Sequence, residues 1–172
     1  PGGNYKTTDI PILSFEAYCL DEMDIAGGHT DDTAETDIEI VDDTHPIAGG
    51  LADGTHTIIG SAQTYNYQTS LGPDCKIVGE TVGGQALLTY YDEGDEGTNA
   101  YSRPTKRAFF TILLGAMDAI NANGLAIVDG IVEWMAPSGP PEATGLLNGG
   151  GSIQATVVGP PGIKYVSETD NF

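Results

Sequence analysis

The sequence has few positively charged residues. Six Lys and Arg stand against 25 Asp and Glu, which gives a net charge of −19 at pH 7. A surface of this charge repels the phosphates of nucleic acids and of anionic membranes, so the composition disfavours a nucleic-acid-binding or membrane-binding protein. Several interpretations of the acidity stay open: it keeps a surface soluble, it reflects a salty habitat, or it lets nucleic acid pass without sticking.

Cysteines and long apolar runs are also scarce. Cys19 and Cys75 are the only cysteines, too few for the disulfide framework of a small secreted protein, and we expect free, partly buried thiols. No apolar stretch approaches the roughly 20 residues that a membrane-spanning helix needs, and no signal-peptide pattern is visible. Because 40% of the 172 residues are hydrophobic, the chain is long and apolar enough to form a folded core.

Motifs that carry catalysis or bind metals are missing. There is no G-x-S-x-G, no phosphate-binding loop followed by G-K-[ST], and no catalytic context around either cysteine. The histidines, His29, His45 and His56, show no metal-ligand spacing, so we expect surface histidines. The acidic loop 92–99 does not match a calcium-binding EF-hand, so a solvated turn is favoured over a calcium site there. We therefore expect no enzyme, no cofactor and no metal, with no catalytic, cofactor-binding or metal-binding residue. The oxygen ligands that a calcium ion would take from the loop are Asp92, Glu93, Asp95, Glu96 and Asn99.

Glycine and proline, by contrast, are plentiful, at 24 and 10 residues. Together with many Thr, Val, Ile and Tyr they favour strands joined by turns. The prediction is a mainly β fold, a β-sandwich or barrel with one short flanking α-helix and long loops. We expect a single domain over residues 1–172, with an N-terminal arm at 1–11 and a C-terminal tail at 163–172.

Period-two alternation and turn residues place the elements along the chain. The segment 85–91 lacks Gly and Pro and is followed by Gly94, which favours a short helix. The run 106–120 is apolar almost all round, so periodicity does not separate strand from helix; its Phe and Thr residues favour a strand at 106–114. Long polar loops are predicted at 21–36 and 42–56. Strands are predicted at 12–20, 37–41, 57–69, 75–78, 106–114, 125–135 and 152–158, with a further short strand in the last ten residues.

Half of the positive charge lies in one short segment, at Arg103, Lys106 and Arg107. Two interpretations stay open for this cluster. The three side chains pair with acidic residues of a neighbouring copy, or they protect a strand edge against aggregation.

The C-terminal third carries a pattern in three pieces: Asp129–Trp134 (DGIVEW), the turn Pro137–Pro140 (PSGP), and Ser152–Pro160 (SIQATVVGP). This pattern resembles the end of the major tail tube proteins of long, non-contractile-tailed bacteriophages. QALLTYYDEG at 85–94 is similar to the short helix of that family, and DIEIVDDTHP at 37–46 to its strand and following loop. The segments 115–124 and 142–151 depart from the family pattern.

The resemblance implies a structural virion protein, made in the host cytoplasm, that self-assembles into hexameric rings. These rings stack as a tube through which DNA passes during genome ejection without specific binding. Its partners would be copies of itself and other tail proteins at the tube ends, with no membrane and no cofactor. The long loops 21–36 and 42–56 would then reach neighbouring rings. On a strand over 125–135, Asp129 and Glu133 share one face with Ile127 and Ile131, and either face the lumen or a subunit seam or simply face solvent. Trp134 would cap the core.

Two alternatives stay open. The first is another virion structural protein, such as a capsid decoration or tail terminator subunit, which is equally β-rich and acidic. The second is a carbohydrate-binding β-sandwich that stacks sugars on aromatic rings. The ring candidates are Tyr65, Tyr67, Tyr90, Tyr91 and Trp134.

Overall fold

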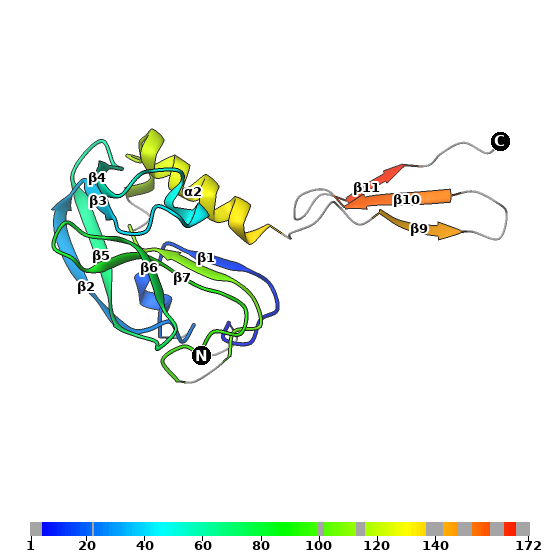
Figure 1. Cartoon of the computed structure of the whole chain (residues 1–172), viewed down its shortest axis with the longest axis horizontal. Helices are drawn as coiled ribbons and strands as arrows, with labels where there is room; N and C mark the ends of the chain where they lie inside the picture. The colour runs from blue at the N-terminus through cyan, green and yellow to red at the C-terminus, as the bar shows by residue number, and fades with distance from the viewer. Residues whose placement is uncertain are drawn as a thin grey trace. The chain divides into compact units, whose positions relative to one another are not determined.

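The computed structural model describes residues 5–21, 23–99, 102–112 and 116–136, and three later strands. The chain divides into two compact units, Pro1–Met135 and Ala136–Phe172. The first unit contains the large sheet and the long helix (Figure 1). The second unit contains a three-stranded antiparallel sheet of order β11–β10–β9. Its strands are β9 (Ala143–Leu147), β10 (Ile153–Val158) and β11 (Lys164–Ser167).

A six-stranded mixed sheet forms the centre of the first unit, in the order β1–β8–β7–β6–β3–β4. β1 and β8 are parallel, and the other neighbours are antiparallel. The predicted mainly β fold with one helix is therefore confirmed. The strands are β1 (Ile12–Ser14), β3 (Asp37–Ile40), β4 (Gly54–Thr57), β6 (Lys76–Glu80), β7 (Ala86–Tyr91) and β8 (Arg107–Phe110).

Both faces of this sheet are buried at β7 and β8. Phe109 and Phe110 are consecutive residues of β8, so their side chains point to opposite faces, and both are fully buried. Phe110 belongs to the core cluster that includes Ile127 and Ile131. Phe109 belongs to a second cluster with Leu20 and Ile25. These two strands consequently have no solvent-facing side.

The prediction of a helix at 85–91 is wrong, because this segment is the central strand β7. Every residue of β7 is buried. A strand covered on both faces needs no polar alternation and reads as a continuous apolar run. The absence of Gly and Pro, which suggested a helix, suits such a strand equally well.

The prediction of a strand at 125–135 is also wrong. The helix α2 spans Ala122–Met135 and lies over the sheet (Figure 1). The Asn121 side chain caps its N-terminus, where Oδ1 accepts hydrogen bonds from the backbone N–H groups of Asn123 (2.9 Å) and Gly124 (3.2 Å). Ile127 and Ile131, one helical turn apart, face the core.

Because the segment 125–135 is a helix, the predicted assignment of its side chains to faces is also wrong. Asp129 and Glu133 are exposed, whereas Ile127 and Ile131 are buried, so the two pairs do not share a face. Trp134 is half-buried and packs against the core, as predicted for a residue that caps it.

The acidic segment 21–36, predicted as a loop, contains the strand β2 (Ala26–Glu35). β2 pairs with β5 (Gln63–Leu71) in an antiparallel ribbon that packs on β7 (Figure 1). Gly27 and Gly28 suggested a turn, but here they lie directly against β5. A Cβ atom on Gly27 would be 3.0 Å from the Cβ atom of Ser70. The glycines therefore permit a close approach of two strands.

Other predictions agree with the structure in varying degree. Those at 37–41, 75–78, 106–114 and 152–158 are confirmed by β3, β6, β8 and β10, and β11 lies in the predicted tail. The strand predicted at 12–20 is only β1, followed by the 3₁₀ helix η1 (Ala17–Cys19). The strand predicted at 57–69 begins later, as β5. The turn predicted at 42–56 includes the 3₁₀ helix η2 (Pro46–Ala48) and most of β4.

We predict that Gly130→Ala destabilises the first unit. A Cβ atom at this position would clash with the carbonyl oxygen of Pro46, at a cost of about 1–3 kcal/mol for overpacking. Helix propensity alone would give the opposite sign, a gain of about 1 kcal/mol. Urea unfolding measures the difference. Val132→Ala, at a helix residue 53% exposed, is the control and should change stability by less than about 0.5 kcal/mol. A Gly130→Ala protein more stable than wild type would contradict the close packing of α2 on η2.

Candidate functional site

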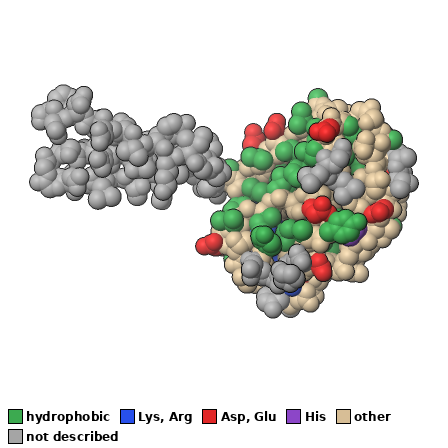
Figure 2. Space-filling view, turned by 180° about the vertical axis from the view of Figure 1, so that it is seen from behind, with side chains coloured by type: hydrophobic (Ala, Val, Ile, Leu, Met, Phe, Trp, Pro, Cys, Tyr) green, Lys and Arg blue, Asp and Glu red, His purple; other side chains and the backbone are tan. Residues whose placement is uncertain are grey.

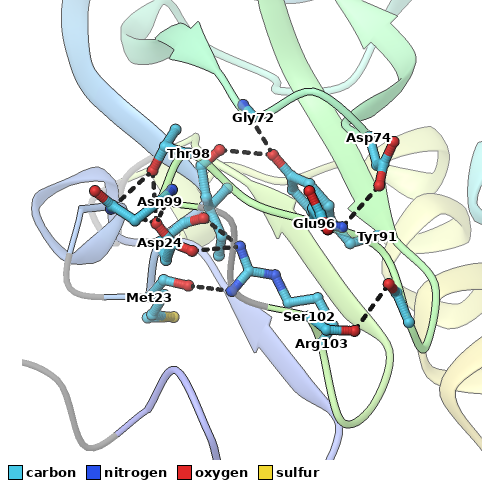
Figure 3. A network of polar contacts seen from close by, with 12 residues as sticks. Met23, Asp24, Gly72, Asp74, Tyr91, Glu96, Thr98, Asn99, Ser102 and Arg103 are labelled. Carbon is cyan, nitrogen blue, oxygen red and sulfur yellow. Dashed lines mark hydrogen bonds and ion pairs between the residues drawn. The ribbon is translucent and has the colours of Figure 1, made fainter.

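Arg103 lies inside the first unit and binds the chain about 80 residues earlier in the sequence. Its guanidinium donates hydrogen bonds to the carbonyl oxygens of Met23 (2.9 Å) and Asp24, and lies 3.6 Å from Asp24 Oδ2 (Figure 3). It also sits over the ring of Tyr91, 5.0 Å from the centroid. Both Arg103 and the Asp24 side chain are shielded from solvent, so this ion pair is a structural one.

Asp24 binds the C-terminal part of the acidic loop 92–99 through hydrogen bonds. Its Oδ1 accepts hydrogen bonds from the Thr98 hydroxyl and the Asn99 backbone N–H, both at 2.7 Å (Figure 3). Burial raises the pKa of this carboxyl, but the hydrogen bonds from Thr98 and Asn99 and the charge of Arg103 outweigh burial and lower it. Gly97 completes the arrangement, because a Cβ atom there would clash with Arg103 and with the Asp24 carbonyl.

The carboxylates of loop 92–99 act in hydrogen bonds rather than as a ligand set. Asp92 and Asp95 accept from Lys76 Nζ at 3.0 and 2.5 Å, and the Glu96 backbone N–H donates to Asp74 at 2.8 Å. Within the residues that the structure describes, no group of three or more His, Cys, Asp or Glu side chains is arranged to hold a metal ion. The calcium alternative finds no support in this loop.

Arg107 is likewise buried, and both interpretations of the basic cluster are wrong for the arginines. Its Nη1 donates to the carbonyl oxygen of Ile10 (2.7 Å) and its Nη2 to that of Thr8 (2.8 Å). Burial lowers the pKa of Arg107 to about 10, with a smaller effect from the charge of Arg103. The side chain remains charged at neutral pH and ties the N-terminal segment to β8.

Three rings meet where the end of α2 reaches the sheet, and we call His45, Tyr90, Trp134, Lys76 and Lys106 the aromatic cluster. His45 stacks on Tyr90 with ring centroids 3.9 Å apart. Trp134 contacts both rings edge-on, at 5.4 Å from His45 and 5.3 Å from Tyr90. The rings come from three elements, since His45 precedes η2, Tyr90 lies in β7 and Trp134 in α2. His45 and Trp134 keep part of their surface exposed, so the cluster is the candidate binding site.

The two lysines complete the cluster, Lys76 from β6 and Lys106 from the position before β8. Lys76 Nζ lies 5.3 Å from the centroid of the Tyr90 ring, and Lys106 Nζ lies 4.9 Å from that of Trp134. Lys106 also donates a hydrogen bond of 2.5 Å to the carbonyl oxygen of Trp134. A cation at the C-terminal end of a helix stabilises it through the helix dipole, and α2 has no basic residue of its own in its last turn.

His45 differs from the surface histidine that the sequence suggested. Its Nδ1 accepts a hydrogen bond of 3.4 Å from the Ile47 backbone N–H and so caps η2. This bond requires an unprotonated Nδ1, and hence a neutral ring with its proton on Nε2. Burial lowers the pKa of His45, against the opposing charges of Asp92 and Asp42.

The remaining candidates are dispersed. His29 contacts Tyr18 edge-on at 4.5 Å, and His56 Nε2 lies 2.7 Å from the Ala52 carbonyl oxygen. Among the proposed stacking residues, Tyr65 and Tyr91 are fully buried and Tyr67 is half-buried. The structure brings together only Tyr90 and Trp134 of that set. No disulfide joins Cys19 and Cys75, and both are half-buried, as predicted.

Comparison with protein families, curated proteins and solved structures finds no match. Two segments that carried the tail-tube resemblance adopt other structures: 85–94 contains β7 instead of a helix, and 129–134 lies in α2 instead of a strand. The segment 37–46 is a strand and loop, and β10 lies in 152–160, as the resemblance implies. The turn 137–140 lies outside the described residues. None of the helices in the described part of the chain is long and apolar enough to cross a membrane.

We predict that Asp24→Asn costs about 3 kcal/mol or more, because it leaves the Arg103 charge buried without its partner. Asparagine tolerates the positive φ of 61° at this position. The folded-state pKa of Asp24 is lowered, so its contribution is present above the ordinary value of 3.8 and is lost as pH falls through the folded-state value. Denaturant unfolding between pH 7 and 2 measures both effects.

The control is Asp118→Asn, at an exposed carboxylate, which should change stability by less than about 0.5 kcal/mol. In the double variant Asp24→Asn/Arg103→Met, the losses should be well below additive, since each single change orphans the other group. Additive losses would contradict the coupling.

Proposed function

We propose that the chain is a structural subunit that associates with copies of itself and presents an anionic exterior. The tail tube of a bacteriophage is the specific assembly that the sequence resemblance suggests. A capsid decoration or tail terminator subunit is the other virion role of this kind. The observation that carries the proposal is the distribution of apolar side chains on the first unit, and the distribution of charge supports it.

Hydrophobic side chains gather on one face of the first unit, with Asp and Glu around them and little Lys or Arg (Figure 2). Three large apolar residues are exposed in the segments that flank the edge strand β1 in the sequence: Tyr5 (55%), Ile10 (62%) and Tyr18 (67%). β1 has one neighbour among the described strands, β8. A free strand edge flanked by exposed apolar residues favours pairing with another chain, and a second copy of this chain is the partner we propose.

The charge distribution sets the conditions for association. Both arginines of the sequence are at most 1% exposed, so they do little to offset the surface carboxylates. Two such surfaces repel each other at low ionic strength, and salt screens this repulsion within about 3 Å at 1 M compared with 10 Å at 0.1 M. The same surface would leave DNA mobile inside a conduit, because it adds like charge to phosphate.

We predict association that strengthens with salt and depends on the apolar residues near β1. Light scattering coupled to gel filtration, with negative-stain electron microscopy, should show larger species at 1 M than at 0.1 M NaCl. Ile10→Lys/Tyr18→Lys should abolish them, whereas Val82→Lys, at an equally exposed apolar residue on the β6–β7 turn, should not. Hollow tubes would support the tail-tube form, and trimers or single rings a decoration or terminator role. A monomer at every salt concentration, or equal effects of both variants, would contradict the proposal.

A second candidate function is carbohydrate binding by the aromatic cluster. The half-exposed rings of His45 and Trp134 meet edge-on at 5.4 Å, next to Asp92 and Asp42, whose charges act on His45. Aromatic faces stack on sugar C–H groups and carboxylates accept from sugar hydroxyls, and convergence of the two is typical of a sugar site.

A glycan array followed by calorimetry tests this second candidate. Binding should fall at least about tenfold in Trp134→Phe, which loses part of the ring surface, and remain unchanged in Tyr18→Phe, at an exposed ring elsewhere. Far-UV circular dichroism checks that both variants fold. A ligand that binds Trp134→Phe as tightly as it binds the wild type would exclude the aromatic cluster as its site.

A further inference from the structure

We propose that the aromatic cluster is a pH-dependent latch: neutral His45 holds the last turn of α2 on the sheet, and protonation of His45 releases it. This inference is independent of self-association and of sugar binding. It follows from the position of one titratable ring, which caps one helix and packs against the end of another.

The cap of η2 requires the neutral ring. His45 Nδ1 accepts from the Ile47 N–H, and Pro46, which follows His45 directly, has no N–H to offer. Protonation places a hydrogen on Nδ1 and turns this acceptor into a donor that faces another donor. Ile47 is fully buried in the main core, so its backbone cannot move away without disturbing the packing. The ring must therefore leave its position.

Leaving that position removes one of the contacts that hold the end of α2. The His45 ring is sandwiched with Tyr90 at 3.9 Å and meets the edge of Trp134 at 5.4 Å. Trp134 is the second-last residue of α2. Trp134 also meets the Tyr90 ring edge-on at 5.3 Å, and its carbonyl oxygen accepts a hydrogen bond from Lys106. When His45 moves, the Trp134 ring loses one of its two aromatic neighbours.

Four charged side chains from different segments of the chain act on His45. Asp42 precedes η2, Asp92 follows β7, Lys76 lies in β6 and Lys106 precedes β8. The two carboxylates favour the protonated ring, but both are already engaged: Asp42 accepts from the Thr44 hydroxyl at 2.6 Å, and Asp92 from Lys76 at 3.0 Å. The two lysines and burial oppose protonation. The docked state therefore prefers neutral His45.

The direction of the pH effect follows. The docked ring has a pKa below the ordinary histidine value of 6.5, so the released form binds the proton more tightly. Docking is complete above pH 6.5, weakens as pH falls below this value, and reaches its limit at the lower pKa of the docked ring. Release frees about one turn, or roughly 5 Å of helix, at the end of the first unit.

Trp134 is the only tryptophan in the sequence, so its fluorescence reports directly on the latch. We would titrate the full chain from pH 8 to 4.5 and measure Trp emission together with hydrogen exchange of the last turn of α2. The expected result is a change in emission with a midpoint below 6.5, accompanied by exchange in this turn at least about tenfold faster after correction for intrinsic rates. Protection of β7 and β8 should stay unchanged.

Two histidine variants make the test specific. His45→Asn retains a side-chain oxygen that can cap η2, but it has neither the titrating group nor the ring that contacts Trp134. Both pH transitions should therefore disappear, and the last turn of α2 should exchange at the fast rate at every pH. His56→Asn removes a histidine outside the cluster and should leave both transitions intact. A transition that persists in His45→Asn, or an emission change without faster exchange of α2, would overturn the latch. Neither result bears on self-association, which is measured at neutral pH.

Discussion

Backbone carbonyls are bound by buried guanidinium groups at two places in the first unit, and the arrangement of its chain depends on these contacts. Arg103 binds Met23 and Asp24, and Arg107 binds Thr8 and Ile10. Hydrogen bonds to a charged donor contribute more than neutral ones, and a buried carbonyl left without a partner is costly. The two arginines therefore fix segments that lie about 80 to 100 residues away in the sequence.

Lys106 lies between these arginines and binds a third segment, the end of α2. Five consecutive residues, 103–107, thus position the turn before β2, the approach to β1 and the C-terminus of the helix. This explains how β1 can pair in parallel with β8 although its register covers only three residues. It also explains why both faces of β8 can be buried, because elements on each side are tied to the same short segment.

The sequence predicted the fold class and the half-buried strand β3, since DIEIV alternates with period two as a strand with one covered face does. It predicted a helix for β7 and a strand for α2, because in both segments tertiary contacts outweigh the local sequence pattern. β7 is buried on both faces and lost its alternation, whereas α2 carries Gly124, Gly130 and several β-branched residues, which are typical of strands and turns. Both glycines lie where a Cβ atom would clash with the backbone of the neighbouring segment, so the tertiary contact overrides local propensity.

The contacts of the buried arginines and of the aromatic cluster could also be predicted from the sequence only in part. The partners of Arg103 and Arg107 are carbonyl groups, which every residue carries, so no residue pattern could identify them. The role of His45 did leave a signal, because a polar residue directly before a proline is typical of a helix N-cap. Its stacking on Tyr90 and its contact with Trp134 join three distant segments and required the structure.

The two edges of the large sheet are not equivalent, and this difference would give the association that we propose a direction. At the end of β4, the Asn121 and Asn123 side chains both donate to the Thr57 carbonyl oxygen, and the Asn121 backbone binds that of Ile58. The chain leading into α2 therefore covers part of that edge. At the opposite edge, Arg107 holds the segment before β1 by its carbonyl groups and leaves the Ile10 side chain exposed. The buried cation thus orders the backbone next to the free edge without adding positive charge to the surface, so a strand that pairs there meets an ordered, apolar border in an otherwise acidic exterior.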